Sequence, residues 1–260
     1  MISKYNLATI SPDFDGSVWD DGCGGTNILF DWTEMQIPNG ACVIKSVSGT
    51  IMGTNGTAAN GVDIRLYFAK SINGVAPAAF GTAHADISVN AAASFRKNIL
   101  GSLLIDMSAI DDADKLVAYN VISSKLAQAS STAGELRSDI MLEGEPNITT
   151  KGYTSIYVAA MANGAAFDFG TDVDLNMAGH QATSVAPVQI TVSGTDPRLV
   201  FQAGDIIVGD AGNSAQAEIV SIDSNVLMTV KNITSTNDQI THTEHLTNKN
   251  PITLNFGLEY

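Results

Sequence analysis

The sequence predicts an all-β protein with an antiparallel β-sandwich or jelly-roll-like body, a small barrel-like module near the C-terminus and an extended N-terminal arm. Three observations support this fold class: apolar and polar residues alternate in short segments, glycine and asparagine are frequent between them, and charged residues make up only 15% of the chain. Alternation with a period of two is typical of strands that bury one face. Glycine and asparagine accept the positive φ angles of tight turns.

An arm and a larger body are predicted from the first two thirds of the chain. Residues 1–40 are rich in aromatic side chains but irregular in pattern, so we expect an extended arm that packs on the body or on a neighbouring subunit. The body is expected over 41–187, and its clearest strands are 41–53 and 61–70. In the second of these strands four apolar side chains share one face, namely Val62, Ile64, Leu66 and Phe68.

The middle of the body is less regular. We expect a strand over 98–107 and a central strand over 152–162, because both segments are apolar. The acidic run at 111–114 would cap a short helix over about 112–128, since carboxylates satisfy free N–H groups at a helix start. The letters LVAYNVI within that range fit a strand equally well, so both interpretations stay open there.

A small β module is predicted over 188–249. Apolar segments recur there at roughly ten-residue intervals, which is typical of a small barrel or sandwich: VQITV, RLVFQ, DIIVG, AEIVSI and VLMTV. Gly204 and Asp205 are expected to form a tight turn that opens one of these strands. The last apolar segment, Ile252–Phe256, is expected to complete the body, which would make the module an insertion.

The charge balance argues against nucleic acid and membrane partners. The net charge is −14 with only 13 lysine and arginine residues, and the densest cationic pair is Arg96-Lys97. Phosphate backbones and anionic lipids are bound through clustered cations, which this sequence lacks. The first residues contain no apolar signal region, and no segment reaches the roughly 18 apolar residues of a membrane helix. We therefore expect synthesis in a cytoplasm without export through a secretory signal.

No catalytic, cofactor-binding or metal-binding residues are predicted. The G-x-S-x-G elbow of serine hydrolases, a P-loop lysine and paired C-x-x-C ligands are absent from the sequence. His242, Glu244 and His245 have a metal-like spacing, but on a strand His245 would point away from the other two. An acidic run offers oxygen ligands for Ca²⁺ without the order of a calcium loop: Asp168, Asp172, Asp174 and Asn176. Cys23 and Cys42 are expected to be thiols, and a disulfide between them stays open.

The aromatic N-terminal segment supplies the candidate interaction residues. As interface anchors of the arm we expect Tyr5, Phe14, Trp19, Phe30 and Trp32. Carboxylates beside tryptophans can also form a sugar site, and this alternative rests on Asp13, Asp15, Asp20 and Asp21. No pair of these acids has a spacing that defines a general acid and base, so an enzyme is not expected.

One C-terminal pattern resembles a known class of protein. It runs from Asp196 to Ile207 as DPRLVFQAGDII and is followed by AEIVSI and VLMTV. This pattern is similar to the small F-x-x-G-D-x-I β modules of virion structural proteins from tailed bacteriophages. The similarity covers about residues 150–260 and carries no catalytic residue with it.

The resemblance implies a non-enzymatic virion protein that decorates or cements a capsid surface. Its partners would be the major capsid protein and further copies of itself, with a trimer as the expected assembly. It would bind no nucleic acid, membrane or cofactor, and it would be made in a host bacterial cytoplasm before joining the virion. A tail, neck or baseplate protein is the alternative within the same class, and a carbohydrate-binding or receptor-binding module is a further one.

Overall fold

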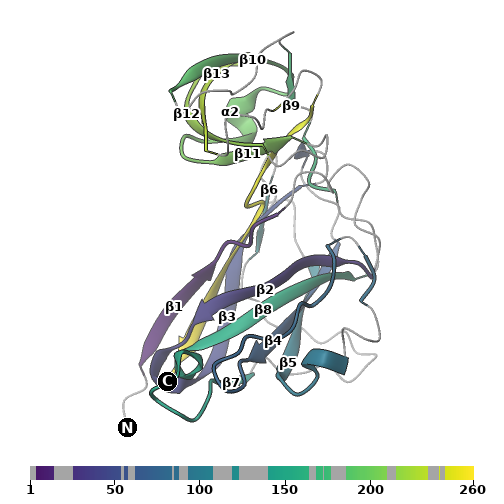
Figure 1. The fold of residues 1–260 in the computed structure, drawn as a ribbon. Helices are drawn as coiled ribbons and strands as arrows, with labels where there is room; N and C mark the ends of the chain where they lie inside the picture. Colours follow the sequence, from purple (N-terminus) through teal and green to yellow (C-terminus); the bar gives the residue numbers. More distant parts are fainter. Residues whose placement is uncertain are drawn as a thin grey trace.

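The computed structural model is an all-β protein, as the sequence predicts. Strand accounts for 57% of it and helix for 9%, so the fold class is confirmed. The strands form three antiparallel sheets, two in a body and one in a smaller module at one end of it (Figure 1). The structure describes residues 4–14, 26–53, 56–57, 62–83, 85–87, 93–107, 119–122, 140–163, 168–171, 173–176, 186–209, 215–233, 240 and 244–260.

The first sheet of the body is built around the strand that comes last in the chain. β15 (Ile252–Glu259) lies between β1 (Tyr5–Ile10) and β3 (Ala41–Met52), and both pairings are antiparallel. On its other side β3 pairs with β6 (Tyr119–Ile122) and, nearer its start, with β7 (Met141–Glu143). The chain therefore returns to the centre of the body after it has built the module.

The second sheet has the order β2-β8-β4-β5. These strands are β2 (Ile28–Gln36), β8 (Ser155–Asn163), β4 (Asp63–Lys70) and β5 (Ile99–Ile105). Ile64, Leu66 and Phe68 of β4 are buried while the residues between them are half-buried, which is the alternation that the sequence predicts. One face of this sheet is therefore available to pack against the first sheet.

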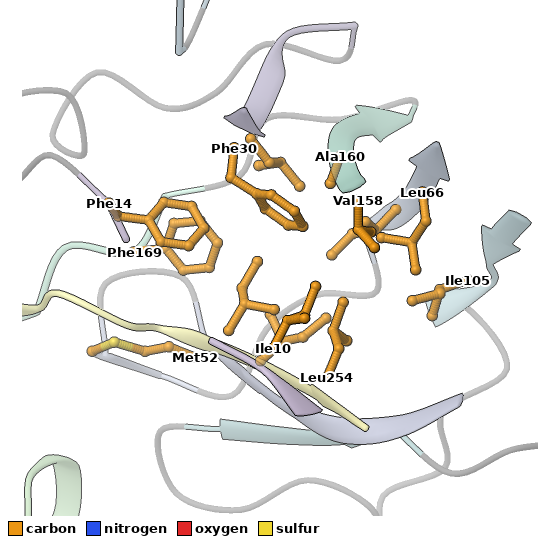
Figure 2. Close-up of a cluster of buried hydrophobic side chains, with 14 of the residues drawn as sticks. Ile10, Phe14, Phe30, Met52, Leu66, Ile105, Val158, Ala160, Phe169 and Leu254 are labelled. Atoms are coloured by element: carbon orange, nitrogen blue, oxygen red, sulfur yellow. The ribbon is translucent and has the colours of Figure 1, made fainter. Parts of the chain in front are cut away.

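The two sheets enclose the main apolar core. Phe30, Leu66 and Val158 of the second sheet point toward Ile10 and Leu254 of the first sheet (Figure 2). The rings of Phe68 and Phe256 also meet between the sheets, with centroids 5.9 Å apart and an interplanar angle of 84°. Edge-to-face contacts of this kind are a favoured arrangement of aromatic rings. The body is thus a β-sandwich.

A second, smaller cluster covers the outer face of the second sheet. Phe80 and Phe95, from the connection between β4 and β5, pack with Ile28 and Ala159 of the sheet. Trp32 joins this cluster, with its ring centroid 4.9 Å from that of Phe80. The indole N–H of Trp32 also donates a 2.9 Å hydrogen bond to a backbone carbonyl in the same connection. The connection is therefore fixed to the sheet and does not lie free.

The module is a nearly closed sheet of six strands with the order β14-β11-β12-β13-β10-β9. A bridge between Asp174 and His245 brings its two ends together. Because β9 belongs to it, the sheet of the module begins earlier than residue 188. The strands are β9 (Val173–Leu175), β10 (Val188–Gly194), β11 (Ile206–Gly209), β12 (Gln216–Ser224), β13 (Leu227–Asn232) and β14 (Leu246–Asn248).

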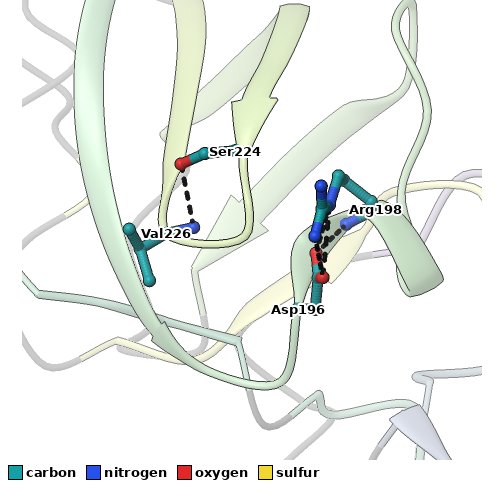
Figure 3. Close-up of polar contacts among 4 residues, drawn as sticks. All are labelled: Asp196, Arg198, Ser224 and Val226. Atoms are coloured by element: carbon teal, nitrogen blue, oxygen red, sulfur yellow. Dashed lines mark hydrogen bonds and ion pairs between the residues drawn. The ribbon is translucent and has the colours of Figure 1, made fainter.

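One predicted strand of the module is instead a short helix. The segment RLVFQ contributes to α2 (Pro197–Val200), so the strand expected there is wrong. Asp196 explains the difference, because its carboxylate accepts a 3.0 Å hydrogen bond from the N–H of Arg198 and caps the helix (Figure 3). Pro197 at the first helical position has a fixed φ that favours the same geometry.

The described parts of the expected N-terminal arm are extended and belong to the sheets of the body. The described parts of residues 1–40 include β1 and β2, which are edge strands of the two sheets of the body. Their buried apolar side chains supply the physical reason, because strand pairing places them in the core and satisfies their backbone groups at once. The helix considered over 112–128 lies mostly outside the described residues, and Tyr119–Ile122 within it is a strand.

Candidate interaction surface

Among the described residues, the large exposed apolar side chains of the body lie on the strands and turns at the end farthest from the module. Figure 1 shows this end of the body at the two chain termini. β15 leaves the module near Ile252 and ends at Glu259, which pairs with Val43 at the start of β3, so these residues mark the far end. We define the distal surface as the large exposed apolar residues of the body: Tyr5, Leu7, Ile72, Val75, Met141, Ile148 and Tyr260. Exposed apolar groups that gather in one region are typical of protein–protein contact sites.

Two turns of the distal surface are joined by a buried carboxylate. Glu145 is buried and accepts a 2.7 Å hydrogen bond from the N–H of Gly74, which lies in the turn after β4. The neighbouring hydroxyl of Ser71 has the largest effect on the pKa of Glu145, and with the N–H of Gly74 it holds this pKa below its ordinary value. The carboxylate is therefore ionised at neutral pH and ties the turn after β4 to the loop after β7.

Close packing fixes these turns further. A Cβ atom added to Gly152, in the short 3-10 helix η6 (Lys151–Tyr153), would overlap Ser71 Oγ and the carboxylate of Glu145. Asn147 turns the same loop, because its side-chain oxygen accepts a 3.0 Å hydrogen bond from the N–H of Thr149. Ile148, which is 75% exposed, is thus held on an ordered loop.

An ion pair lies beside the apolar residues at this end. Glu34 of β2 accepts hydrogen bonds from Lys151 Nζ at 2.8 Å and from Ser155 Oγ at 2.7 Å. The bond from Lys151 is the largest of the causes that lower the pKa of Glu34. Nearby, the phenol of Tyr153 donates a 3.0 Å hydrogen bond to the carbonyl of Asn39, in the 3-10 helix η2 (Pro38–Gly40). The polar groups around the distal surface are therefore largely satisfied within the chain.

The strand β1 offers a different kind of binding surface, an open sheet edge. The backbone groups of Lys4 and Tyr260 exchange hydrogen bonds of 3.1 and 3.0 Å, which fixes the phase of the β1–β15 ladder. In an antiparallel pair the bonded residues alternate, so the N–H and C=O groups of Tyr5, Leu7 and Thr9 point away from β15. Within the described part of the chain no strand pairs with this outer side of β1.

The side chains on this edge are apolar and exposed. Tyr5 is 70% and Leu7 is 64% exposed, and both lie on the outer face of the first sheet. The strand pairings place Tyr5, Glu259, Val43 and Met141 in one row across that face, because directly paired residues point to the same side. The only ionic group in this row is Glu259, which Lys45 neutralises at 3.1 Å.

Polar side chains fix the junction between the body and the module. The amide of Asn250 donates to the carbonyls of Ser11 at 3.1 Å and Pro12 at 2.9 Å, and to the carboxylate of Asp13 at 3.0 Å. Asp13 also pairs with Lys249 at 3.1 Å. The segment that follows β1 is therefore fastened to the segment that connects β14 with β15.

The predicted turn at Gly204 and Asp205 is part of this junction. Gly204 has a φ of +95° and directly precedes β11 with Asp205, and the carboxylate of Asp205 accepts a 3.0 Å hydrogen bond from the N–H of Gln202. Burial raises the pKa of Asp205 above its ordinary value. Burial has the largest effect on the pKa of Tyr119 and, with the nearby Asp205, raises it to about 12. The phenol of Tyr119 donates a 3.1 Å hydrogen bond to the carbonyl of Val200.

The structure separates the five aromatic residues that the sequence nominated as interface anchors. Phe14 and Phe30 are buried in the main core with their ring centroids 5.9 Å apart, so they stabilise the chain itself. Trp32 is packed under the connection between β4 and β5. Tyr5 is exposed on the distal surface, and Trp19 lies outside the described residues.

The acidic residues considered for metals do not gather into a metal site in the described part of the chain. Asp174 Oδ1 lies 2.5 Å from Nδ1 of His245, and Asp168 accepts a 2.7 Å hydrogen bond from the N–H of Gly170. No group of three or more His, Cys, Asp or Glu side chains among the described residues could hold a metal ion. The remaining members of these sets lie outside the described residues: Asp15, Asp20, Asp21, Asp172 and His242.

Cys42 is a free thiol in the core, and burial raises its pKa to about 11. Its suggested partner, Cys23, lies outside the described residues. In the part of the chain that the structure describes, every helix is too short or too polar to cross a membrane.

Sequence patterns did not identify the residues that build the distal surface. Met141, Val75 and Ile148 lie in short loops or short strands, where no periodicity shows which side chains are exposed. No sequence pattern indicates that Glu145 is buried either. Its burial depends on a contact between the loop after β7 and Gly74, and these two segments are distant in sequence. Only Tyr5 was nominated in advance, on account of its aromatic character.

Comparisons with known proteins identify no family for this chain. No protein-family model matches it. No curated protein matches its sequence either.

Proposed function

We propose that this chain is a non-enzymatic structural protein of a tailed-phage particle, which decorates or cements the capsid through its distal surface. The observation that carries the proposal is the distal surface itself, since the exposed large apolar residues of the body are gathered at one end and held on ordered turns. A protein that docks on a shell needs one adhesive end and a rigid body, and a β-sandwich with locked loops supplies both. The phage assignment rests on the resemblance of the module.

The charge supports the same proposal. A net charge of −14 keeps many copies soluble and apart in solution, because like-charged molecules repel. The distal surface is a local exception, since Glu34 and Glu259 are both paired with lysines there. An acidic protein with one apolar end docks in a defined orientation, with the module directed away from the shell.

Binding to purified capsids tests the proposal. We expect Val75→Asp and Ile148→Asp to abolish occupancy, because each places a charge in the apolar contact, while Leu199→Asp on α2 leaves occupancy unchanged. Leu199 is a matched control, since it is 51% exposed and lies on the module. Occupancy is measured by mass spectrometry of repurified particles, and circular dichroism checks that each variant is folded. Full occupancy of both distal variants would overturn the proposal.

A tail, neck or baseplate component is the alternative within the same class, because the same adhesive end would serve there. The number of copies per particle separates the two. A decoration protein is expected in a number comparable to that of the major capsid protein, whereas a baseplate protein is expected in far fewer copies. A trimer, expected from the resemblance, is the alternative to the two-fold dimer proposed in the next subsection, and sedimentation of the purified protein distinguishes the two assemblies.

A further inference from the structure

We propose that the open edge of β1 pairs with β1 of a second copy of this chain, antiparallel and across a two-fold axis. This contact would join the first sheets of two molecules into one continuous sheet. It rests on the proposed function only in that a particle protein is expected to associate with itself, and it is tested on purified protein without capsids.

The backbone of β1 is available for such a contact. Tyr5, Leu7 and Thr9 each direct one donor and one acceptor away from β15, and no described strand receives them. Unpaired strand edges are templates for another strand, and proteins usually protect them with charges, prolines or bulges. The β1–β15 pairing has no register shift, and neither proline nor an acidic residue occurs in Tyr5–Ile10.

The comparison with other edges of the body favours β1. Among the described edge strands, only β1 and β7 carry large exposed apolar side chains, and β7 has three residues. β2, the edge of the second sheet, contains the exposed Asp31, whose carboxylate would oppose the approach of a second acidic molecule. With a net charge of −14 on each chain, two copies can approach most closely along a segment without carboxylates.

The sequence of β1 is self-complementary in one register. In β1 only the odd-numbered residues direct their backbone N–H and C=O groups toward the open edge. A two-fold axis at Leu7 therefore places Leu7 opposite the same residue of the second copy and Tyr5 opposite Thr9 of the partner subunit. The inward-facing residues then pair without conflict, with Asn6 opposite Ala8 in each half. No like charges face one another, because Lys4 is opposite an Ile10. The exposed side chains of Tyr5 and Leu7 are covered in the same contact.

The contact is expected to be weak in dilute solution. A single pair of short strands buries less than the roughly 1,200 Å² of a standard stable interface. Purified protein is therefore expected to change from monomer to dimer as its concentration rises, and sedimentation equilibrium measures that change. Leu7→Lys is expected to abolish the dimer, because it places two like charges at the axis, whereas Leu199→Lys on the module leaves it unchanged.

Engineered cysteines test the register. In a Cys23→Ser background, Leu7→Cys is expected to form a disulfide-linked dimer on oxidation. Directly bonded antiparallel residues have Cα atoms about 5.5 Å apart, within the usual range for a disulfide. Tyr5→Cys alone and Thr9→Cys alone are expected to form no disulfide-linked dimer, because each cysteine faces a residue without a thiol, but their equimolar mixture is expected to cross-link. Leu199→Cys is the control for random collision.

Each result of the cross-linking and sedimentation experiments either supports or overturns the two-fold pairing of β1. Selective cross-linking of Leu7→Cys and of the mixture supports the two-fold pairing, whatever the capsid assay shows. The inference is overturned if the protein stays monomeric at every concentration, or if Leu199→Cys cross-links as well as Leu7→Cys. A trimer that leaves Leu7→Cys reduced would overturn it too. Loss of capsid binding by Val75→Asp with intact β1 cross-linking would separate the two proposals.

Discussion

Truncation of Phe256 is expected to show how strongly the last strand of the chain holds the two sheets together. Phe256 and Phe68 are fully buried, and their rings meet edge to face between β15 and β4. Replacing a buried phenylalanine with alanine removes its transfer free energy and leaves a cavity, at a cost of about 3–5 kcal/mol. Domains have a total unfolding free energy of about 5–15 kcal/mol, so Phe256→Ala removes a large part of it.

A double-mutant cycle isolates the contact between the two rings. We expect Phe68→Ala and Phe256→Ala together to cost less than the sum of the single changes, with a coupling of about 0.5–1.5 kcal/mol from the aromatic pair. Urea unfolding measures each free energy, with fluorescence of Trp32 as a signal from the body. Val226→Ala, on the exposed β12–β13 hairpin, serves as control and is expected to change stability by less than about 0.5 kcal/mol.

The result that would refute this reasoning is specific. If Phe256→Ala cost less than about 1 kcal/mol, the ring could not be buried between two sheets, because even a well-relaxed cavity costs more. If both single changes were costly but their effects were simply additive, the rings would not be in contact. The packing of β15 against the second sheet would then have to be reconsidered.

Three further changes test other parts of the structure. Gly49→Ala is expected to destabilise the first sheet by more than about 2 kcal/mol, because an added Cβ would overlap the carbonyl of Thr253 and the φ of Gly49 is +152°; thermal unfolding that matches the wild type would contradict this. Because its folded pKa is lowered, Glu145 contributes stability that is present above its ordinary pKa of 4.5 and lost as pH falls through the folded value. The difference in urea midpoint between the wild type and Glu145→Gln should therefore shrink in acid, and a constant difference from pH 7 to pH 3 would argue against it. Cys42 is expected to resist alkylation in the folded protein at pH 8 and to react after unfolding, since it is buried with a pKa of about 11; rapid labelling of native protein, followed by mass spectrometry, would disprove this.

The strands with regular alternation could be predicted from the sequence. The alternation of apolar residues at Ile64, Leu66 and Phe68 predicts β4, because one face of this strand meets the core and the other does not. The turn at Gly204 was also predictable, since glycine tolerates the positive φ that the turn requires. Both signals are local, and the structure preserves them because packing and local preference agree.

The positions of the first two strands could not be predicted, because they depend on distant partners. β1 pairs with β15 across almost the whole chain, and nothing in Tyr5–Ile10 itself shows that Ile252–Glu259 will lie beside it. Trp32 was nominated for an interface or a sugar site because tryptophan is common in both. Its actual neighbours, Phe80 and Phe95, reach it through a connection that has no periodic pattern.

The distal surface was missed for a related reason. Sequence periodicity indicates which residues one sheet can bury, but it does not indicate which loops a buried carboxylate brings together. In the sequence Glu145 looks like any acidic residue of a loop. Only its hydrogen bond with the N–H of Gly74 shows that it joins two turns at the end of the body. Such sites are recognised from contacts and not from spacing.

The order in which the strands leave the ribosome has a consequence for how the body is made. Sheet pairing requires β15 between β1 and β3, yet β15 begins at Ile252, about two hundred residues after β3 ends at Met52. At elongation rates of about 5–20 residues per second, β1 and β3 therefore wait for roughly ten seconds or more without their shared neighbour. During that interval the nascent chain cannot complete the sandwich, and the module itself closes only when β14 has been made, directly before β15. Premature association of unfinished molecules is then best avoided by slow synthesis at low local concentration or by a chaperone that shields the waiting strands.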